Sequence, residues 1–189
     1  MRVLVACEYS NIVASAFRLR GHSVLSCDII ENDFPSRWHI KDDVFNVLKS
    51  TSFDLMIAFP PCTYLCKAQF HLLAQSPERQ KKSLDSVDFV RRLYLSQVPK
   101  IAIENPIGVL NSVFRKPDQI TSPANFGNQH HKDICLWLKN LPPLIDTCIN
   151  VRRQPVRNHV NGHMSQEQKS KIKSKFFPEL AAAMANQWG

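Results

Sequence analysis

A cysteine that follows two prolines is the residue in this chain best placed to act as a nucleophile. Residues 59–63 read FPPCT, so Cys62 comes directly after Pro60 and Pro61. The fixed φ angles of two prolines make a loop rigid, and a rigid loop presents the next side chain from one direction. An accessible thiol with a lowered pKa attacks electrophilic carbon as the thiolate. Cys62 is therefore a candidate nucleophile, with a small buried core residue as the alternative.

The sequence argues against two other uses of this cysteine, in a phosphatase loop and in a zinc site. A phosphatase loop places an arginine six positions after its cysteine, and Ala68 stands there instead. A zinc site could be drawn from Cys62, Cys66, His130 and His131. The spacing of these two pairs is poor for a structural zinc site, so we expect no metal.

Carboxylates end two of the apolar runs. Glu104 follows the apolar run at 101–103 and is a candidate binding residue. An unpaired carboxylate at the end of a buried strand is costly, so the alternative is that Glu104 caps a structure or forms an ion pair.

Asp28 lies about 20 residues after the first turn, a spacing typical of a carboxylate that holds ribose hydroxyls. That turn, ACEYSN, has no glycine, which argues against a pyrophosphate pressed onto the backbone. A nucleoside cofactor without phosphates, such as S-adenosylmethionine, fits this turn. The alternative for Asp28 is an acidic residue of an ordinary turn that binds no ligand.

Strands and helices alternate around these residues. Apolar runs predict strands at 2–6, 22–27, 53–58, 101–105 and 134–138, with a short strand and a short helix within 39–49. Helical patterns run from a cap at Ser10 to Gly21, over about 78–96, and through 176–188, where Pro178 fits a first turn. This order predicts an α/β, Rossmann-like fold with a doubly wound, mostly parallel sheet. Ligands bind past the carboxyl ends of such strands, so Cys62 and Glu104 can face one pocket.

The bulk composition is that of a globular protein. The chain has 189 residues, 44% hydrophobic and 21% charged, which predicts a single domain over 1–189. No apolar run reaches the roughly 18 residues of a membrane span, and no signal peptide is evident, so we expect a cytoplasmic protein without a membrane partner. The six cysteines lie mostly in apolar runs, and no disulfide framework is expected.

Basic charge is concentrated late in the chain. The net charge is +8, which favours polyanionic partners. Residues 151–175 hold seven Lys and Arg side chains and a single acid, Glu167. They belong to a weakly patterned stretch at about 140–173, which is either a solvated surface loop or a phosphate-contacting segment.

Taken together, these motifs resemble those of the cytosine 5-specific DNA methyltransferases. FPPCT at 59–63 is similar to the family's Pro-Cys motif, and IENP at 103–106 to its Glu-Asn motif. Short, phage-type members of the family begin with an Ala-Cys-Glu turn, as in ACEYS here. They also carry segments similar to RKPDQI, FGNQHHKDICLWLKNLPPL and FPELAAAMANQWG. The resemblance covers most of 1–145 and about the last fifteen residues.

The resemblance implies a set of functional residues. Cys62 would be the nucleophile that adds to cytosine carbon 6, and Glu104 would bind the ring at nitrogen 3 and the amino group. DNA, duplex or single-stranded, would be the partner, and a base in a duplex would be flipped out of the stack. Pro61, Thr63, Asn105 and Lys132 would contact the substrate. S-adenosylmethionine would be held by Cys7, Glu8, Tyr9, Ser10, Asp28, Ile29, Asp43, Val44, Phe59 and Pro60.

Several positions depart from the family pattern. Pro106 replaces the usual valine, Lys132 stands where an arginine is expected, and Asp42 stands where short members have glycine. Lysine cannot make the bidentate contact of arginine. Only residues 140–173 are available for target recognition, so low or short sequence specificity is expected. Two alternatives remain: a cytosine-modifying enzyme with a modified donor or a free nucleotide acceptor, and a catalytically inactive DNA-binding relative.

Overall fold

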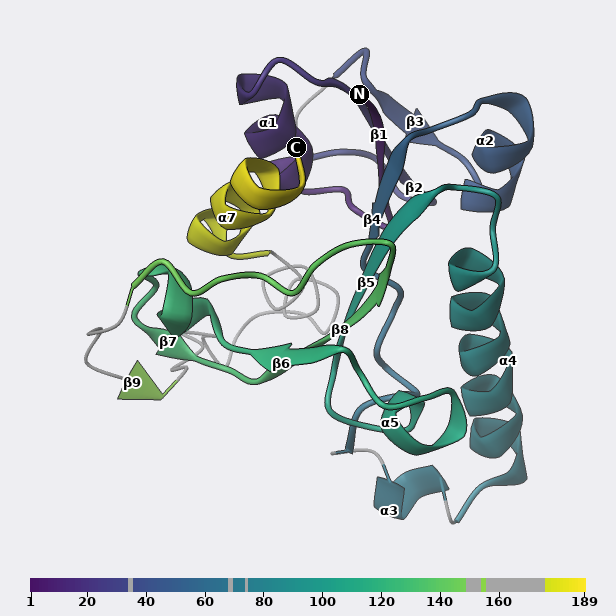
Figure 1. The fold of residues 1–189 in the computed structure, drawn as a ribbon. Helices are drawn as coiled ribbons and strands as arrows, with labels where there is room; N and C mark the ends of the chain where they lie inside the picture. The colour runs from purple at the N-terminus through teal and green to yellow at the C-terminus, as the bar shows by residue number, and fades with distance from the viewer. Residues whose placement is uncertain (34–35, 68–69, 74, 149–153, 156–175) are drawn as a thin grey trace.

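A seven-stranded sheet forms the centre of the computed structural model (Figure 1), which describes residues 1–33, 36–67, 70–73, 75–148, 154–155 and 176–189. The strand order is β3-β2-β1-β4-β5-β8-β6. The strands are β1 (Arg2–Ala6), β2 (Ser23–Asp28), β3 (His39–Lys41), β4 (Leu55–Ala58), β5 (Lys100–Pro106), β6 (Gln119–Thr121) and β8 (Ile134–Lys139). A separate pair joins β7 (His130–His131) to β9 (Gln154–Pro155).

The first five strands of this sheet are parallel, and β8 runs antiparallel to β5 and to β6. The prediction of a doubly wound, mostly parallel sheet is therefore confirmed. The antiparallel edge was not predicted, because ICLWL reads as a buried strand in either direction. β6 was missed because its three residues, QIT, are too few to show a period.

Helices cover both faces of the sheet (Figure 1). They are α1 (Ile12–Leu19), α2 (Val44–Ser50), α3 (Phe70–Leu73), α4 (Pro77–Tyr94), α5 (Leu110–Val113), the 3₁₀ helix η2 (Pro123–Phe126) and α7 (Pro178–Trp188). Alternate residues of β1 belong to two cores: Val3 and Val5 pack with α1 and α7, whereas Leu4 and Ala6 pack with α2 and α4. This alternation buries both sides of the strand and explains its continuous apolar run.

The start of α1 differs from its prediction. Ser10 was expected to cap this helix, but the N-cap is Asn11, whose side chain makes no capping hydrogen bond. The helix amides are bound instead by Glu8, whose carboxylate accepts from Val13 N at 2.7 Å and Ala14 N at 3.1 Å. A carboxylate at a helix N-terminus satisfies orphan donors and favours the dipole, so it replaces the hydroxyl cap. Gly21, at φ 82°, ends the helix region as expected.

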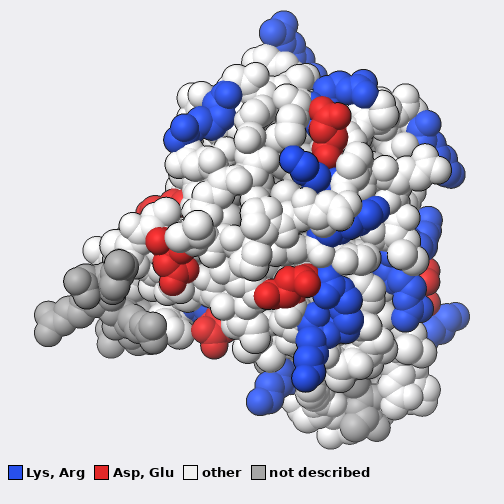
Figure 2. Space-filling view, in the orientation of Figure 1, with Lys and Arg blue, Asp and Glu red and all other residues white. Residues whose placement is uncertain are grey.

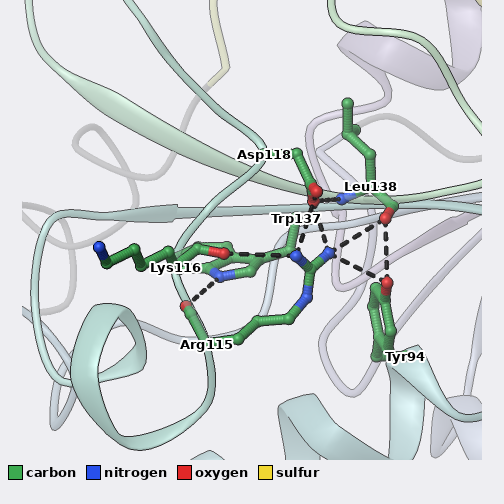
Figure 3. Close-up of polar contacts among 6 residues, drawn as sticks. All are labelled: Tyr94, Arg115, Lys116, Asp118, Trp137 and Leu138. Atoms are coloured by element: carbon green, nitrogen blue, oxygen red, sulfur yellow. Dashed lines mark hydrogen bonds and ion pairs between the residues drawn. The ribbon is translucent and has the colours of Figure 1, made fainter.

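A polar cluster closes the amino-terminal end of β6 against β8 (Figure 3). Asp118 accepts a hydrogen bond from Leu138 N at 2.6 Å, and Arg115 donates to Leu138 O at 3.1 Å. Arg115 also forms an ion pair with Asp118 and donates to the Tyr94 hydroxyl of α4. The cluster therefore satisfies backbone groups of β8 beyond the end of the β6 ladder.

None of the helices in the described part of the chain is long and apolar enough to cross a membrane.

Candidate active site

A cavity of about 230 Å³ opens at the carboxyl ends of β1, β2 and β4. Cys62 and Thr63 line it together with Pro61, and Asp28 lines it from the end of β2. Cys62 is exposed to solvent, and Pro61 and Thr63 are exposed beside it. The sulfur at position 62 is thus accessible at the mouth of a cleft, as a nucleophile must be.

Cys62 lies within electrostatic range of Glu104 and Lys132. Desolvation by neighbouring atoms raises the pKa of the Cys62 thiol, the Glu104 carboxylate and the Cys66 thiol raise it further, and Lys132 lowers it. Burial likewise raises the pKa of Glu104, and Lys132 opposes that effect. The loop after β4, the end of β5 and the residue two before β8 therefore converge at one place.

Asn105 is not among the residues that line this cleft. Its side chain is buried and its amide Nδ2 donates to Pro60 O at 2.8 Å, while its Oδ1 has no hydrogen-bond partner within the described chain. Asn105 thus ties the end of β5 to the loop that carries Cys62. In this structure it contacts the protein itself rather than the cleft that was expected to receive the substrate.

The β1–α1 turn forms the floor of the cavity. Cys7 adopts a left-handed backbone with φ 58°, a conformation that glycine usually supplies. Glu8, Tyr9 and Ser10 follow it along the cavity, and Ser10 Oγ donates to Glu8 Oε1 at 3.2 Å. Burial raises the pKa of Glu8, and the hydrogen bonds from Val13, Ala14 and Ser10 oppose that rise. The turn therefore adopts, without a glycine, a backbone conformation that glycine usually supplies.

A smaller cavity of about 60 Å³ adjoins this turn at the ends of β2 and β3. Asp28, Ile29, Asp43 and Val44 line it, with Cys7 at its inner side. Asp43 caps α2, since its Oδ1 accepts from Phe45 N at 2.8 Å. Burial raises the pKa of Asp28, and hydrogen bonds from the Ile30 and Ile29 amides oppose that effect.

The cleft region is acidic although the chain is basic. A third cavity, of about 290 Å³, adjoins Cys7 and carries Asp85. The residues that line the three cavities include five acids, namely Glu8, Asp28, Asp42, Asp43 and Asp85. No Lys, Arg or His is among these described lining residues. Such a lining attracts a cationic ligand and repels a phosphate.

Another cavity, of about 480 Å³, is larger than the three at the strand ends and lies elsewhere. Residues 48–53, before β4, and 96–98, before β5, line it, so it lies at the amino ends of these strands. It contains none of the residues singled out in the sequence. Ligands of open α/β sheets bind at the carboxyl ends, and we place the candidate site there.

Known structures share this architecture. A solved methyltransferase, EhMeth of Entamoeba histolytica, superposes with a TM-score of 0.50 and 17% sequence identity. The match covers 82% of this chain and 57% of EhMeth, so the chain spans little more than half of that protein. The fold is that of a Rossmann-like methyltransferase.

Other comparisons found less. The 16S rRNA methylase RmtB superposes with a TM-score of 0.36 at 14% identity, over 73% of this chain and 55% of RmtB, too weak a likeness to support further argument. No protein-family model and no curated protein matches the sequence.

Two further residues, Phe176 and Gly108, lie at the site or against its loop, although the sequence analysis did not identify them. Phe176, which precedes α7, lines the main cavity, and its ring lies 4.6 Å from that of Phe59. Gly108 packs directly against the loop after Cys62. Phe176 lies more than a hundred residues from the cleft in sequence and carries no local signal. Gly108 had a signal, because the chain has only five glycines.

One expectation falls mostly outside the described residues, and the zinc alternative falls within them. The basic segment 151–175 lies outside, apart from 154–155. For the zinc alternative, no group of three or more potential metal ligands gathers within the described ranges.

Proposed function

We propose that this chain is an S-adenosylmethionine-dependent transferase that methylates carbon 5 of cytosine in DNA. The observation that carries the proposal is the convergence of the exposed Cys62 thiol with Glu104 and Lys132 beside an acidic cleft of a methyltransferase fold. The sequence motifs around Cys62 and Glu104 support cytosine as the target.

Cys62 would begin the reaction. Cytosine carbon 5 is a poor nucleophile, and addition of the thiolate to carbon 6 makes the ring enamine-like and raises electron density at carbon 5. The thiol must first lose its proton. Burial, Glu104 and Cys66 disfavour that loss, and Lys132 is the neighbouring charge that favours it. Lys132 is therefore the residue that stabilises the thiolate.

Glu104 would stabilise the activated ring. Its raised pKa lets the carboxylate take up a proton more readily than an ordinary glutamate does, so it can share that proton with ring nitrogen 3 as negative charge develops there. After transfer, loss of the carbon 5 proton and expulsion of the Cys62 thiolate restore the aromatic ring and the free enzyme.

The residues of the cleft fit S-adenosylmethionine. Asp28 is placed at the end of β2, where a carboxylate binds ribose hydroxyls, and Asp43 and Val44 lie beside it. The acidic lining suits a cofactor with a positive sulfonium and no phosphate. When bound, this cofactor supplies the electrophilic methyl group.

The extra carboxylate of Asp42 does not favour a modified donor. Its Oδ1 accepts from Asp43 N at 2.6 Å and from Asn46 Nδ2 at 3.0 Å, so it is engaged at the start of α2. DNA is preferred over a free nucleotide as the acceptor because of the net charge of +8.

The decisive experiment is covalent trapping on DNA that contains 5-fluorocytosine. Fluorine at carbon 5 cannot leave as a proton does, so the methylated adduct stays bound to Cys62. We expect a denaturation-resistant complex that requires the cofactor, is lost in Cys62→Ala and persists in Cys148→Ala. Absence of the complex from a wild-type protein that binds S-adenosylmethionine by calorimetry would exclude the proposed chemistry.

A further inference from the structure

The backbone around Cys62 is held by the residues that come next in the chain. Leu65 N and Cys66 N both donate to Cys62 O, at 3.0 and 3.1 Å. Leu65 is buried. The position of the Cys62 backbone therefore depends directly on where Leu65 and Cys66 lie.

These residues are paired with the segment that follows β5. Cys66 forms an antiparallel bridge with Gly108. On either side of that bridge, the Val109 amide donates to Leu65 O at 2.7 Å, and the Lys67 amide donates to the residue 107 carbonyl at 3.1 Å. The segment at 107–109 continues from β5, the strand that carries the proposed ring-binding carboxyl. The two halves of the proposed catalytic pair thus belong to one hydrogen-bonded unit.

Gly108 allows this close approach. A Cβ atom at this position would lie 1.9 Å from Leu65 O and 2.9 Å from Cys66 Cα. Both contacts are with backbone atoms, which cannot rotate away as a side chain can. Any larger residue at 108 must push the two segments apart.

A second contact holds the other side of the loop. Asn105 Nδ2 donates to Pro60 O at 2.8 Å, two residues before Cys62. The loop is therefore attached to the end of β5 both before and after the thiol.

We propose that Gly108 is a positioning residue for the reaction of Cys62, an inference that rests on the proposed function. The backbone contact at Gly108 sets the placement of the thiol relative to the Glu104 carboxyl. A misplacement of about 1 Å between reacting groups costs on the order of 100-fold in rate.

Gly108→Ala tests this directly. We expect kcat for methyl transfer to DNA to fall by about 100-fold, with KM for DNA and the calorimetric Kd for S-adenosylmethionine within about threefold of wild type. The pH profile of Cys62 alkylation by iodoacetamide, measured by peptide mass spectrometry, should also shift to lower pH. That shift arises because Glu104 moves away from the thiol while Cys66 and Lys132 are the other groups that face it. A wild-type kcat and an unshifted profile would overturn the proposal.

Gly21→Ala is the matched control. Gly21 has φ 82° and nothing within 4 Å of its Cβ position, so alanine there strains the backbone without a clash. It should lower the melting temperature and leave kcat and the alkylation profile unchanged below that temperature. An equal loss of kcat in both variants would reduce Gly108 to a stability residue and overturn the proposal.

Asn105→Ala probes the same positioning without a clash, should Gly108→Ala fail to fold. We expect kcat to fall about tenfold at unchanged KM. Asn140→Ala, which also removes a 2.8 Å hydrogen bond from an asparagine amide to a proline carbonyl, should leave kcat unchanged. A rise in KM alone for Asn105→Ala would indicate a substrate contact and count against positioning.

The alkylation profile separates this inference from the proposed function. If wild type makes no methylcytosine, the proposed function fails. In that case the reactivity of Cys62 toward iodoacetamide still measures its displacement. An unshifted pH profile of alkylation in both Gly108→Ala and Asn105→Ala would overturn the positioning role of Gly108.

Discussion

The thiol of Cys62 combines exposure with an unfavourable charge environment. Desolvation, Glu104 and Cys66 all raise its pKa, and Lys132 lowers it. The thiolate fraction of such a group grows as the pH rises, so alkylation of Cys62 should speed up through the alkaline range.

Glu104→Gln should separate reactivity from catalysis. The substitution removes the negative charge beside Cys62, so it lowers the thiol pKa and speeds alkylation by about 3- to 10-fold at pH near 8.5. Methyl transfer should nevertheless fall by at least about 100-fold, because ring nitrogen 3 loses its proton donor. Iodoacetamide labelling and methyl transfer from labelled cofactor measure the two effects.

Glu31→Gln is the control: it removes an exposed carboxylate that forms a surface ion pair with Lys41, and it should change neither rate. Slower alkylation of Cys62 in Glu104→Gln would contradict the assigned electrostatics.

At the scale of elements, the edge of the sheet depends on the Arg115–Asp118 cluster (Figure 3). Burial alone would raise the pKa of Asp118, but hydrogen bonds from Arg115 and Leu138 N lower it below its ordinary value. A carboxyl with a lowered folded-state pKa stabilises the fold above its unfolded pKa. That contribution is lost as the pH falls through the folded-state pKa.

Asp118→Ala should therefore lower the free energy of unfolding by about 2 kcal/mol at pH 7, since it leaves Arg115 and Leu138 N without their shared acceptor. The difference from wild type should shrink as the pH falls below the ordinary carboxyl range and the wild-type carboxyl gains its proton. Urea unfolding at several pH values measures both.

Glu78→Ala, which breaks an exposed ion pair with Lys82 on α4, should cost clearly less than Asp118→Ala, because solvent and salt screen exposed pairs. An equal cost for the two variants would show that the cluster adds nothing to the edge of the sheet.

At the scale of the whole molecule, basic side chains are prominent on the surface, whereas acids line the cavities at the strand ends. Lys and Arg side chains are spread over the face seen in Figure 2, most densely on its right half, where α4 lies in Figure 1. The three cavities at the strand ends are lined by acids and by no described basic residue. A polyanion would meet the basic surface, and a cationic cofactor the recessed cleft.

DNA binding and cofactor binding should therefore respond differently to salt. We expect DNA affinity to fall by at least about 100-fold between 50 and 200 mM salt, because neutralised phosphates release counterions. The affinity for S-adenosylmethionine should change by less than about threefold over the same range, since burial and hydrogen bonds hold most of it. Fluorescence anisotropy and calorimetry measure the two, and a salt-independent DNA affinity would argue against a phosphate-binding surface.

Much of the fold was predictable because each element satisfies its own local rules. Continuous apolar runs predicted the strands to within about two residues at their ends, and Gly21 and Pro178 marked helix boundaries. The pairing of Cys62 with Glu104 also followed, because parallel strand ends share one edge.

The sequence by itself determined the parallel core of the sheet and the loop that presents Cys62, since these depend on residues that are neighbours along the chain. Only the tertiary structure decided that Glu8 replaces Ser10 at the start of α1, that Asn105 holds a loop, and that Phe176 enters the cleft. It alone placed Gly108 against the backbone after Cys62. Each of these roles comes from a contact between segments that sequence spacing does not bring together, so its physical cause exists only once the chain is packed.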